Sequence, residues 1–551
     1  MKRLPWFRPG HVEATELAEL SEPSSGIAAD TKRMEELGRK SRTPLERRFV
    51  HGKAVWGLAS TVVITWQNMV LLSPIALLSG GLAGFFWASI VVFAAMWVVY
   101  IGLREKAERW PVAAGQYYWV AQLAPRRYAK PLSYLSGWKL MSAWQVFLAA
   151  GVMIIGNGIA ALVVYLNGSS PIWLPTVVGI ITTILIFVVN RWCPQGLARA
   201  EYMLLIFHLT VFVVFMAVLL GLRKHSGLPY AMPRDMFLTF RNGGGWNSMG
   251  AAVVLTAVVP MSSAIGYDCI IHLGKPAPGN YAVELIADCV SGEEIQKAAS
   301  IVPKVFIWAY SANCILGLCT VVAVTLSIND IDTLLSTPLS LSGSVGPVVQ
   351  MLDTATASRS WTTAVFTLLL LILIPCCINS NTSASRQLWA FAEDGALPNS
   401  AWIGNVDEHE RVPSNALLLT LIAPIGLSLL NLGSPIALNA IVSLVIINLV
   451  VSYLLVASTS LYSRCTRTTA WPDHMTYGLG YRTGIAVDIF TIGFLATGSV
   501  IVMFPPVTHP TAAQMNWAVV LFVGDCGIGV LFYYFHGRRH YLCALTVVED
   551  G

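Results

Sequence analysis

Charge is scarce in this sequence. Only 12% of the 551 residues are Asp, Glu, Lys or Arg, whereas 55% are apolar, and the mean hydropathy is +0.63. Soluble domains carry about 25% charged residues, and a chain of this length folded in water would need that charge on its surface. The composition therefore excludes an ordinary soluble protein and favours one whose surface faces lipid.

Motifs for catalysis, metals and nucleotides are also missing. The sequence has no H-E-x-x-H, no G-x-S-x-G and no P-loop. Its ten cysteines lack metal-type spacing, and most lie in apolar runs, where Cys behaves as a small hydrophobe. We therefore expect no enzyme, no metal, no cofactor and no ATP-driven pump.

Polar residues gather at the N-terminus. Residues 1–53 hold eleven Lys or Arg and no early apolar run of the signal-peptide kind. Frequent Ser, Pro, Gly and Glu predict a mostly disordered tail. A basic segment beside a membrane is typical of a cytosolic tail, so we expect no nucleic-acid partner.

Long apolar runs are abundant. A bilayer span needs about 20 mainly apolar residues, and backbone that crosses lipid must pair its own polar groups, so these runs are predicted to be helices. The alternation typical of barrel strands is absent. The predicted fold is an all-α integral membrane protein with twelve transmembrane helices between residues 54 and 536, followed by a short tail, 537–551. The candidate spans are residues 54–79, 82–103, 133–165, 172–190, 201–221, 249–272, 301–328, 362–384, 413–431, 435–461, 484–505 and 516–536.

The distribution of Lys and Arg predicts the orientation. With both termini in the cytosol, the inside segments hold 29 Lys or Arg and the outside loops hold 5. Cytosolic loops carry the excess of positive charge in membrane proteins. An odd number of spans would spoil this bias, so the count favours twelve.

Polar residues interrupt the first span at Thr65, Trp66, Gln67 and Asn68. Polar side chains at this depth are costly unless they face the bundle interior. One interpretation is a broken helix whose free backbone groups bind a solute. The alternative is hydrogen bonding between helices.

The sixth span carries a second interruption, residues 260–268, with the sequence PMSSAIGYD. Pro260 removes a backbone donor, Ser and Gly loosen the helix, and Asp268 is ionisable. The combination predicts a broken helix with a polar site, and the alternative is a proline kink with Asp268 at the cytosolic interface. Spans one and six correspond in a five-plus-five repeat, in which interrupted helices mark the binding site.

Other polar residues are weaker candidates. Trp144 and Gln145 in span three could line a cavity, or they could be packed with one hydrogen bond. Asp268, Glu105 and Glu294 are candidates for proton coupling or gating, although each could lie at the cytosolic interface.

Several motifs resemble one family. Residues 111–120 read PVAAGQYYWV and are similar to its P-T-A-G-G-Q-Y-x-W-V loop after span two. Residues 383–394 read SASRQLWAFAED and are similar to its A-S-R-Q-x-[WY]-A-F-A-R-D segment after span eight. Residues 412–416 and 504–506 fit two further landmarks. The chain thus resembles, from about residue 54 to 540, the fungal amino acid/choline transporter branch of the amino acid–polyamine–organocation superfamily.

The resemblance implies a LeuT-like fold, with spans 1–5 and 6–10 as inverted repeats and two added C-terminal helices. It implies uptake of an amino acid or related amine such as 4-aminobutyrate, coupled to protons. Choline or a polyamine is the alternative solute, and a non-transporting nutrient receptor is an alternative class. The resemblance places the substrate site at Thr65, Trp66, Gln67, Ser262, Ala264, Ile265, Gly266 and Tyr267.

The chain departs from the family pattern at two points. Gln67 stands where the family often has an acid, so direct pairing with an ammonium group is not expected from it. After span six, residues 274–292 separate His272 from Glu293, which are nearly adjacent in the family. Residues 274–291 are therefore either a loop insertion or an unspliced intron. We expect a multi-pass protein of the plasma membrane, with the vacuole as the alternative.

Overall fold

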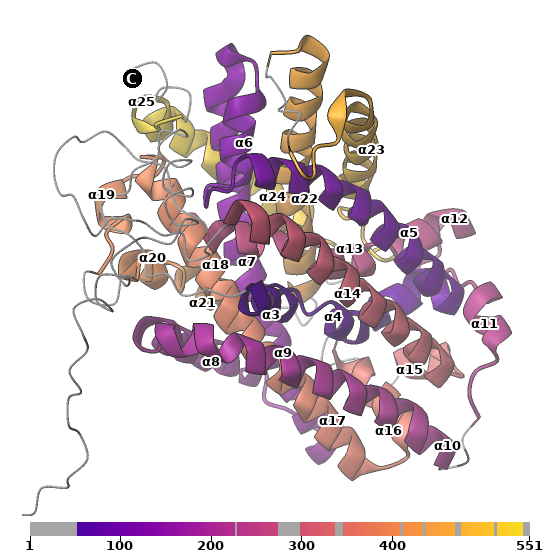
Figure 1. Cartoon of the computed structure of the whole chain (residues 1–551). Coiled ribbons are helices and arrows are strands. Elements are labelled where there is room, and N and C mark those ends of the chain that lie inside the picture. The colour runs from indigo at the N-terminus through magenta and orange to yellow at the C-terminus, as the bar shows by residue number, and fades with distance from the viewer. Residues whose placement is uncertain are drawn as a thin grey trace, which may run out of the picture.

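The computed structural model covers the chain and describes residues 52–273 except 226 and 228, together with 298–336, 345–407, 412–433, 437–468, 475–511 and 515–543. The described residues form helices and no β-strand, apart from one isolated bridge between Gly81 and Phe240 (Figure 1). The predicted N-terminal tail, the candidate insertion 274–291 and Glu294 lie outside the described residues.

The helices confirm the all-α fold and the twelve apolar segments. Eleven described helices are long and apolar enough to cross a membrane, and the shorter Val55–Leu71 precedes them. Span one consists of α3 (Gly52–Val63), α4 (Thr65–Leu71) and the first turns of α5 (Ser73–Arg109). The backbone of α5 leaves helical geometry at Gly81 (φ 71°), where span two begins.

A Cβ at Gly81 would lie 2.8 Å from the Arg241 Cβ, so this junction requires glycine.

The later elements are α6 (Gln116–Leu123), α7 (Arg126–Asn167), α8 (Leu174–Trp192), α9 (Pro194–Ala217), η1 (Val218–Leu222), α10 (Arg223–His225), α11 (Pro233–Leu238), α12 (Met249–Leu255), α13 (Val258–Ala264), η2 (Tyr267–Leu273), α14 (Ala298–Ser327), α15 (Ile331–Ser336), α16 (Gly346–Thr356), α17 (Arg359–Leu371), α18 (Leu373–Glu393), α19 (Ser400–Ile403), α20 (Ser414–Leu419), α21 (Ile422–Ser428), η4 (Leu429–Leu432), α22 (Ala437–Thr466), α23 (Gly480–Ile501), α24 (Ala518–Phe532), η5 (Tyr533–Gly537) and α25 (Arg538–His540).

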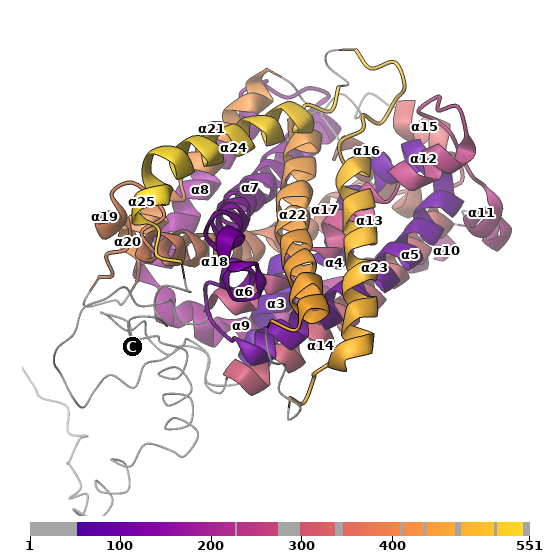
Figure 2. The same cartoon turned by 90° about the horizontal axis from the view of Figure 1, so that it is seen from above.

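The packing of the spans fits the predicted five-plus-five repeat. Span one packs against span six through α4 and α13, and span two against span seven through α5 and α14. Span three packs against span eight through α7 and α18, and span four against span nine through α8 and α21. A two-fold axis in the membrane plane relates spans five places apart and can bring such pairs into contact. The last two spans, α23 and α24, pack against α22 at the edge of this core (Figure 2).

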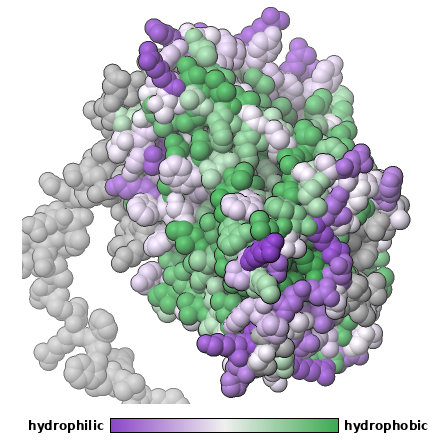
Figure 3. All heavy atoms as spheres, turned by 90° about the vertical axis from the view of Figure 1, so that its right-hand side faces the viewer, coloured by the Kyte–Doolittle hydropathy of each residue, from purple (hydrophilic) through white to green (hydrophobic). Residues whose placement is uncertain are grey.

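The outer surface is apolar in the manner of a lipid-facing bundle. Large side chains such as Leu185 of α8, Val213 of α9 and Val523 of α24 are exposed. Figure 3 shows hydrophobic residues spread across one face of the molecule, with hydrophilic residues gathered towards its edges. An exposed apolar area of this extent would cause aggregation in water, whereas lipid covers it.

A buried charge cluster ties α5 to α22 and α23. Arg464 donates to Glu105 and, at 3.2 Å, to Asp488. Lys106 lies 3.3 Å from carboxylate oxygens of the same two residues. All four side chains are at most 2% exposed. Two cations and two carboxylates balance, so the cluster holds no net charge inside the protein.

Candidate functional site

Span one is broken at Ile64. This residue has φ 43° and ψ 44°, in the left-handed region, between the end of α3 and the start of α4. A β-branched residue rarely adopts this conformation, and its cost is about 1–3 kcal/mol. Tertiary contacts must therefore hold the break in place.

Span six is broken at Ile265 and Gly266. Helix α13 ends at Ala264, Ile265 is extended, and Gly266 has φ 95° before the tight η2 helix begins. Glycine suits this conformation because it has no Cβ to clash. The predicted break thus falls inside the sequence PMSSAIGYD.

Thr65 joins the two breaks. Its hydroxyl donates to the Ser263 carbonyl at 2.8 Å and shares a 2.7 Å hydrogen bond with the Tyr267 hydroxyl. The Ala264 carbonyl accepts from Tyr100 of α5 at 2.7 Å. Two carbonyls freed at the end of α13 are therefore satisfied by side chains, and spans one and six are held together at the breaks.

A small cavity lies between the two breaks. Its volume is about 40 Å³, and a water molecule needs on the order of 10–15 Å³ by this measure. The cavity could therefore hold a few waters, and an amino acid would fit only if its walls moved. Spans one, three, six, eight and ten supply the lining residues, which are Ile64, Asn68, Leu72, Phe147, Ala150, Gly151, Ile154, Ser262, Ile265, Cys376, Val442 and Val445.

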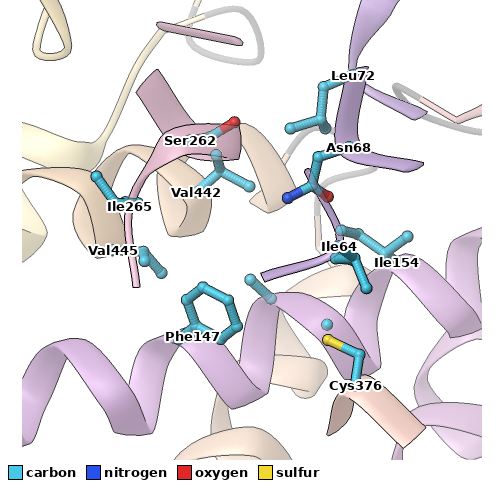
Figure 4. A pocket seen from close by; sticks show the side chains of 12 residues that line it. Ile64, Asn68, Leu72, Phe147, Ile154, Ser262, Ile265, Cys376, Val442 and Val445 are labelled. Carbon is cyan, nitrogen blue, oxygen red and sulfur yellow. The ribbon is translucent and has the colours of Figure 1, made fainter. Parts of the chain in front are cut away.

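Asn68 and Ser262 are the two polar residues of this lining other than Cys376. Both project into the space between α4 and α13 (Figure 4). Each is 7% exposed. The Ser262 hydroxyl donates to the Val259 carbonyl at 2.7 Å and keeps its lone pairs. Among the described residues the Asn68 side chain has no hydrogen-bond partner, so its amide can serve a polar solute.

Trp66 and Gln67 point away from the cavity, towards His208 of α9. The Trp66 indole donates to His208 Nε2 at 3.1 Å, and its ring packs against Phe212 and Phe215. An indole N–H can only donate, so His208 Nε2 carries a lone pair and Nδ1 carries the proton.

The Gln67 amide then has a defined orientation. Its oxygen accepts from His208 Nδ1 at 3.2 Å, and its nitrogen donates to the Ile64 carbonyl at 3.0 Å. Gln67 thus bonds the carbonyl of the strained residue itself. A glutamate carboxylate here would lack the N–H for that bond. The bond to Ile64 therefore explains why a neutral glutamine suits this position.

Tyr267 faces an aromatic cluster. Its ring lies 5.8 Å from that of Tyr100 and 5.2 Å from that of Tyr310, edge to face in both cases. Tyr267, Ala264 and Gly266 are buried and are not among the residues that line the cavity, whereas Ser262 and Ile265 are. These three residues shape the break, and Ser262 and Ile265 supply the wall.

Asp268 lies beyond the break, fully buried, with Gln116, Tyr453 and His272 around its carboxyl group. Gln116 of α6 donates at 2.8 Å and Tyr453 of α22 at 2.5 Å. His272 Nε2 lies 3.1 Å away, and its Nδ1 is 3.0 Å from the Ala113 carbonyl. Asp268 and His272 thus fasten η2 to the segment between spans two and three.

Trp144 and Gln145 lie beside the site rather than in the lining. Trp144 packs between Phe147 and His272, with ring centroids 5.3 and 6.0 Å away. Gln145 donates to Thr420 of span nine at 3.2 Å. Glu105 belongs to the buried charge cluster described above, where it also accepts from the Leu479 amide at 2.9 Å.

The sequence reasoning missed the residues that α7, α18 and α22 bring to the cavity. Phe147, Gly151, Cys376 and Val442 are apolar or small residues within apolar helices, so no sequence signal distinguishes them from packing residues. Asn68 did have a signal, because it belongs to the polar run of span one. In the described part of the chain, no group of three His, Cys, Asp or Glu residues could hold a metal ion.

Broken helices around a small central cavity define a multi-pass membrane carrier. The model of the amino acid permease family matches residues 55–524, most of the chain. The protein belongs to this family, and it is a permease.

Fungal permeases and transporters are among its relatives. The GABA-specific permease of Saccharomyces cerevisiae is 26% identical over 95% of this chain and 86% of its own length. The choline transporter of the same yeast is 24% identical, with 89% and 81% covered. Amino-acid permease 2 of Neurospora crassa is 24% identical, with 97% and 95% covered. Among solved structures, Mhp1, a nucleobase–cation symport-1 family transporter, is 12% identical with a TM-score of 0.47 over 91% of this chain and 99% of its own.

Proposed function

We propose that this permease imports small zwitterions, namely amino acids or related amines such as 4-aminobutyrate, by proton symport across the plasma membrane. The observation that carries the proposal is the cavity between the two broken helices, into which the Asn68 amide projects without a hydrogen-bond partner among the described residues. A neutral amide offers two donors and an acceptor. It can therefore bind the carboxylate or the ammonium group of a zwitterion.

The charge of the lining favours a zwitterion over a net cation. Among the described residues that line the cavity, none is charged. A polyamine would bring several positive charges into this low-dielectric site without a carboxylate to pair with them, which is costly. Choline would have Phe147 for a cation–π contact, and one relative is named a choline transporter, so choline is the second candidate.

Uptake in a yeast strain that lacks its own permeases tests the proposal. The labelled solutes are 4-aminobutyrate, several neutral amino acids, choline and spermidine, offered at acidic and neutral pH with the empty vector as control. We expect uptake of at least one zwitterion that falls at neutral pH and collapses with an uncoupler. Uptake of choline or spermidine alone would refute the substrate class, and uptake insensitive to pH and uncoupler would refute symport.

Surface labelling of the expressed protein is the companion measurement. A protein at the plasma membrane that takes up none of these solutes would contradict the proposed function and favour a receptor. A protein held on the vacuole would contradict the proposed location only, and isolated vacuoles would then replace whole cells in the same assay.

A further inference from the structure

Asp268 and His272 are hydrogen-bonded to each other in η2, the second half of span six, and we call this arrangement the closed pair. Both side chains are fully buried. The pair is one helical turn apart, and His272 Nε2 lies 3.1 Å from Asp268 Oδ2. The other imidazole nitrogen, Nδ1, lies 3.0 Å from the Ala113 carbonyl, just before α6.

The hydrogen bonds fix how many protons the pair holds. A carbonyl oxygen can only accept, so His272 Nδ1 carries a proton. Nε2 and Oδ2 each carry a lone pair unless protonated, so their contact requires one proton between them. Either a doubly protonated His272 faces a carboxylate, or a neutral His272 faces a protonated Asp268. Both forms have zero net charge and share one exchangeable proton.

The groups in direct contact with the pair are polar or aromatic. Gln116 of α6 and Tyr453 of α22 donate to the carboxylate, and Trp144 of α7 packs against the imidazole. Tyr100 of α5, Cys269 of η2 and Tyr453 of α22 interact electrostatically with Asp268. Further titratable or charged groups near the pair or on the elements packed around it include Tyr267 of η2, Glu201 of α9, Lys304, Tyr310 and Cys314 of α14, Arg464 of α22 and, on α18, Cys376, Cys377 and the buried Arg386, which donates to Ser385.

Loss of the shared proton would destabilise this arrangement. The pair would then place two lone pairs against each other and leave a buried negative charge. The rigid imidazole of His272 is held at both nitrogens, so repulsion at Nε2 would displace the ring and strain its bond to the Ala113 carbonyl, which holds η2 against the segment between spans two and three. In the predicted orientation, this half of span six leads to the cytosol.

We propose that the proton shared by Asp268 and His272 is the proton coupled to transport, and that its release opens the cavity towards the cytosol. This inference rests on the proton symport proposed above. The proton leaves from between Nε2 and Oδ2 to water, His272 remains neutral with its proton on Nδ1, and Asp268 becomes a carboxylate. Reprotonation from the outer side restores the closed pair and completes the cycle.

Asp268→Asn removes the exchangeable proton of the pair but leaves groups that can form the same hydrogen-bond contacts. The new amide nitrogen can donate to Nε2 of a neutral His272, and the oxygen can still accept from Tyr453. The Gln116 amide, which donates to Asp268 Oδ2 in the wild type, can turn over so that its Oε1, buried without a hydrogen-bond partner in the described residues, accepts the second N–H. The variant therefore keeps every bond of the closed pair but has no proton to release.

The experiment compares accumulation, exchange and proton influx for the substrate found in the uptake screen. For Asp268→Asn we expect accumulation, substrate-induced proton influx and exchange of external labelled for internal unlabelled substrate all to fall at least tenfold, because a pair with no proton to release keeps the cavity closed towards the cytosol. Binding of the labelled substrate to the purified protein should stay within about twofold of the wild type, since neither Asp268 nor His272 lines the cavity. His272→Gln should likewise lose proton influx. Glu201→Gln, which alters another fully buried carboxyl, is the matched control and should keep it.

The outcomes separate the two proposals. Wild-type uptake without proton influx would refute symport itself. With a proton-coupled wild type, an Asp268→Asn variant that still moves protons with substrate would overturn the inference, as would loss of influx in Glu201→Gln alone. An Asp268→Asn variant that still exchanges substrate would also overturn it, because the cavity would then open without proton release. So would a variant that reaches the surface but no longer binds the substrate, because Asp268 would then serve binding or folding.

Discussion

Asn68→Leu tests the cavity most directly. Leucine has the same number of side-chain heavy atoms as asparagine, so the substitution removes the polar groups with little change in volume. A hydrogen bond to a charged group contributes about 1.5–3 kcal/mol. Because each 1.4 kcal/mol is about tenfold in affinity, we expect the KM for the zwitterion to rise about 10- to 150-fold. Maximal uptake should change much less, since ground-state binding is what is lost.

The assay is concentration-dependent uptake, normalised to the amount of protein at the cell surface. Gln145→Leu is the matched control, because Gln145 is also a polar residue in a span but donates to Thr420 outside the cavity lining. We expect its KM to stay within about twofold of the wild type, since it loses no contact with the solute. An unchanged KM in Asn68→Leu, or an equal rise in Gln145→Leu, would refute the placement of the substrate beside Asn68.

Three further substitutions test the packing around the site. Arg464→Met should lower the free energy of unfolding by about 3–5 kcal/mol because it leaves Glu105 and Asp488 underpaired, and adding Asp488→Asn should recover part of this loss. Thermal denaturation in detergent measures both variants, and equal stability of the two would contradict this explanation. Gly151→Ala should cost about 1–3 kcal/mol by overpacking, because its Cβ would lie 2.8 Å from the Cys377 sulfur, and Cys377→Ala should relieve it in the same assay. Lys139→Met should destabilise more than Lys139→Met with Asp525→Leu, since Lys139 and Asp525 are 2.6 Å apart and the double change leaves no unpaired charge; a larger loss in the double variant would refute this.

The sequence predicted the spans well because lipid imposes a length and a composition on each of them. It also predicted the break in span six, where Pro260, two serines and Gly266 weaken the helix together. The polar run of span one was also interpreted as a broken helix, but the residue at which the helix breaks was not predicted. Its pivot is Ile64, a residue whose intrinsic preference opposes the left-handed conformation. That conformation depends on bonds from Gln67 and on the contacts of Thr65 with span six, and these cannot be read from one segment alone.

The side chains that face the cavity were predicted less well, for a geometric reason. Consecutive helical residues point about 100° apart, so a run of four polar residues covers every direction. Ile64, Asn68 and Leu72 are four residues apart and share the face that lines the cavity. Trp66 and Gln67 turn to His208 instead. Without the neighbouring helices, nothing in the sequence indicates which of the four side chains meets the solute.

The bonds at the two breaks constrain how the cavity can open. Thr65 binds both Ser263 and Tyr267, so it joins span one to each half of span six, on both sides of Gly266. Asp268 and His272 both lie in the second half of span six, and their hydrogen bonds fasten that half to α6, to α22 and to the Ala113 carbonyl. Loss of the shared proton therefore loosens η2 at Ala113 without separating the broken helices from each other. On this geometry the two broken spans would move together relative to α6 and α22, and a proton held at Asp268 and His272 would decide whether that movement can begin.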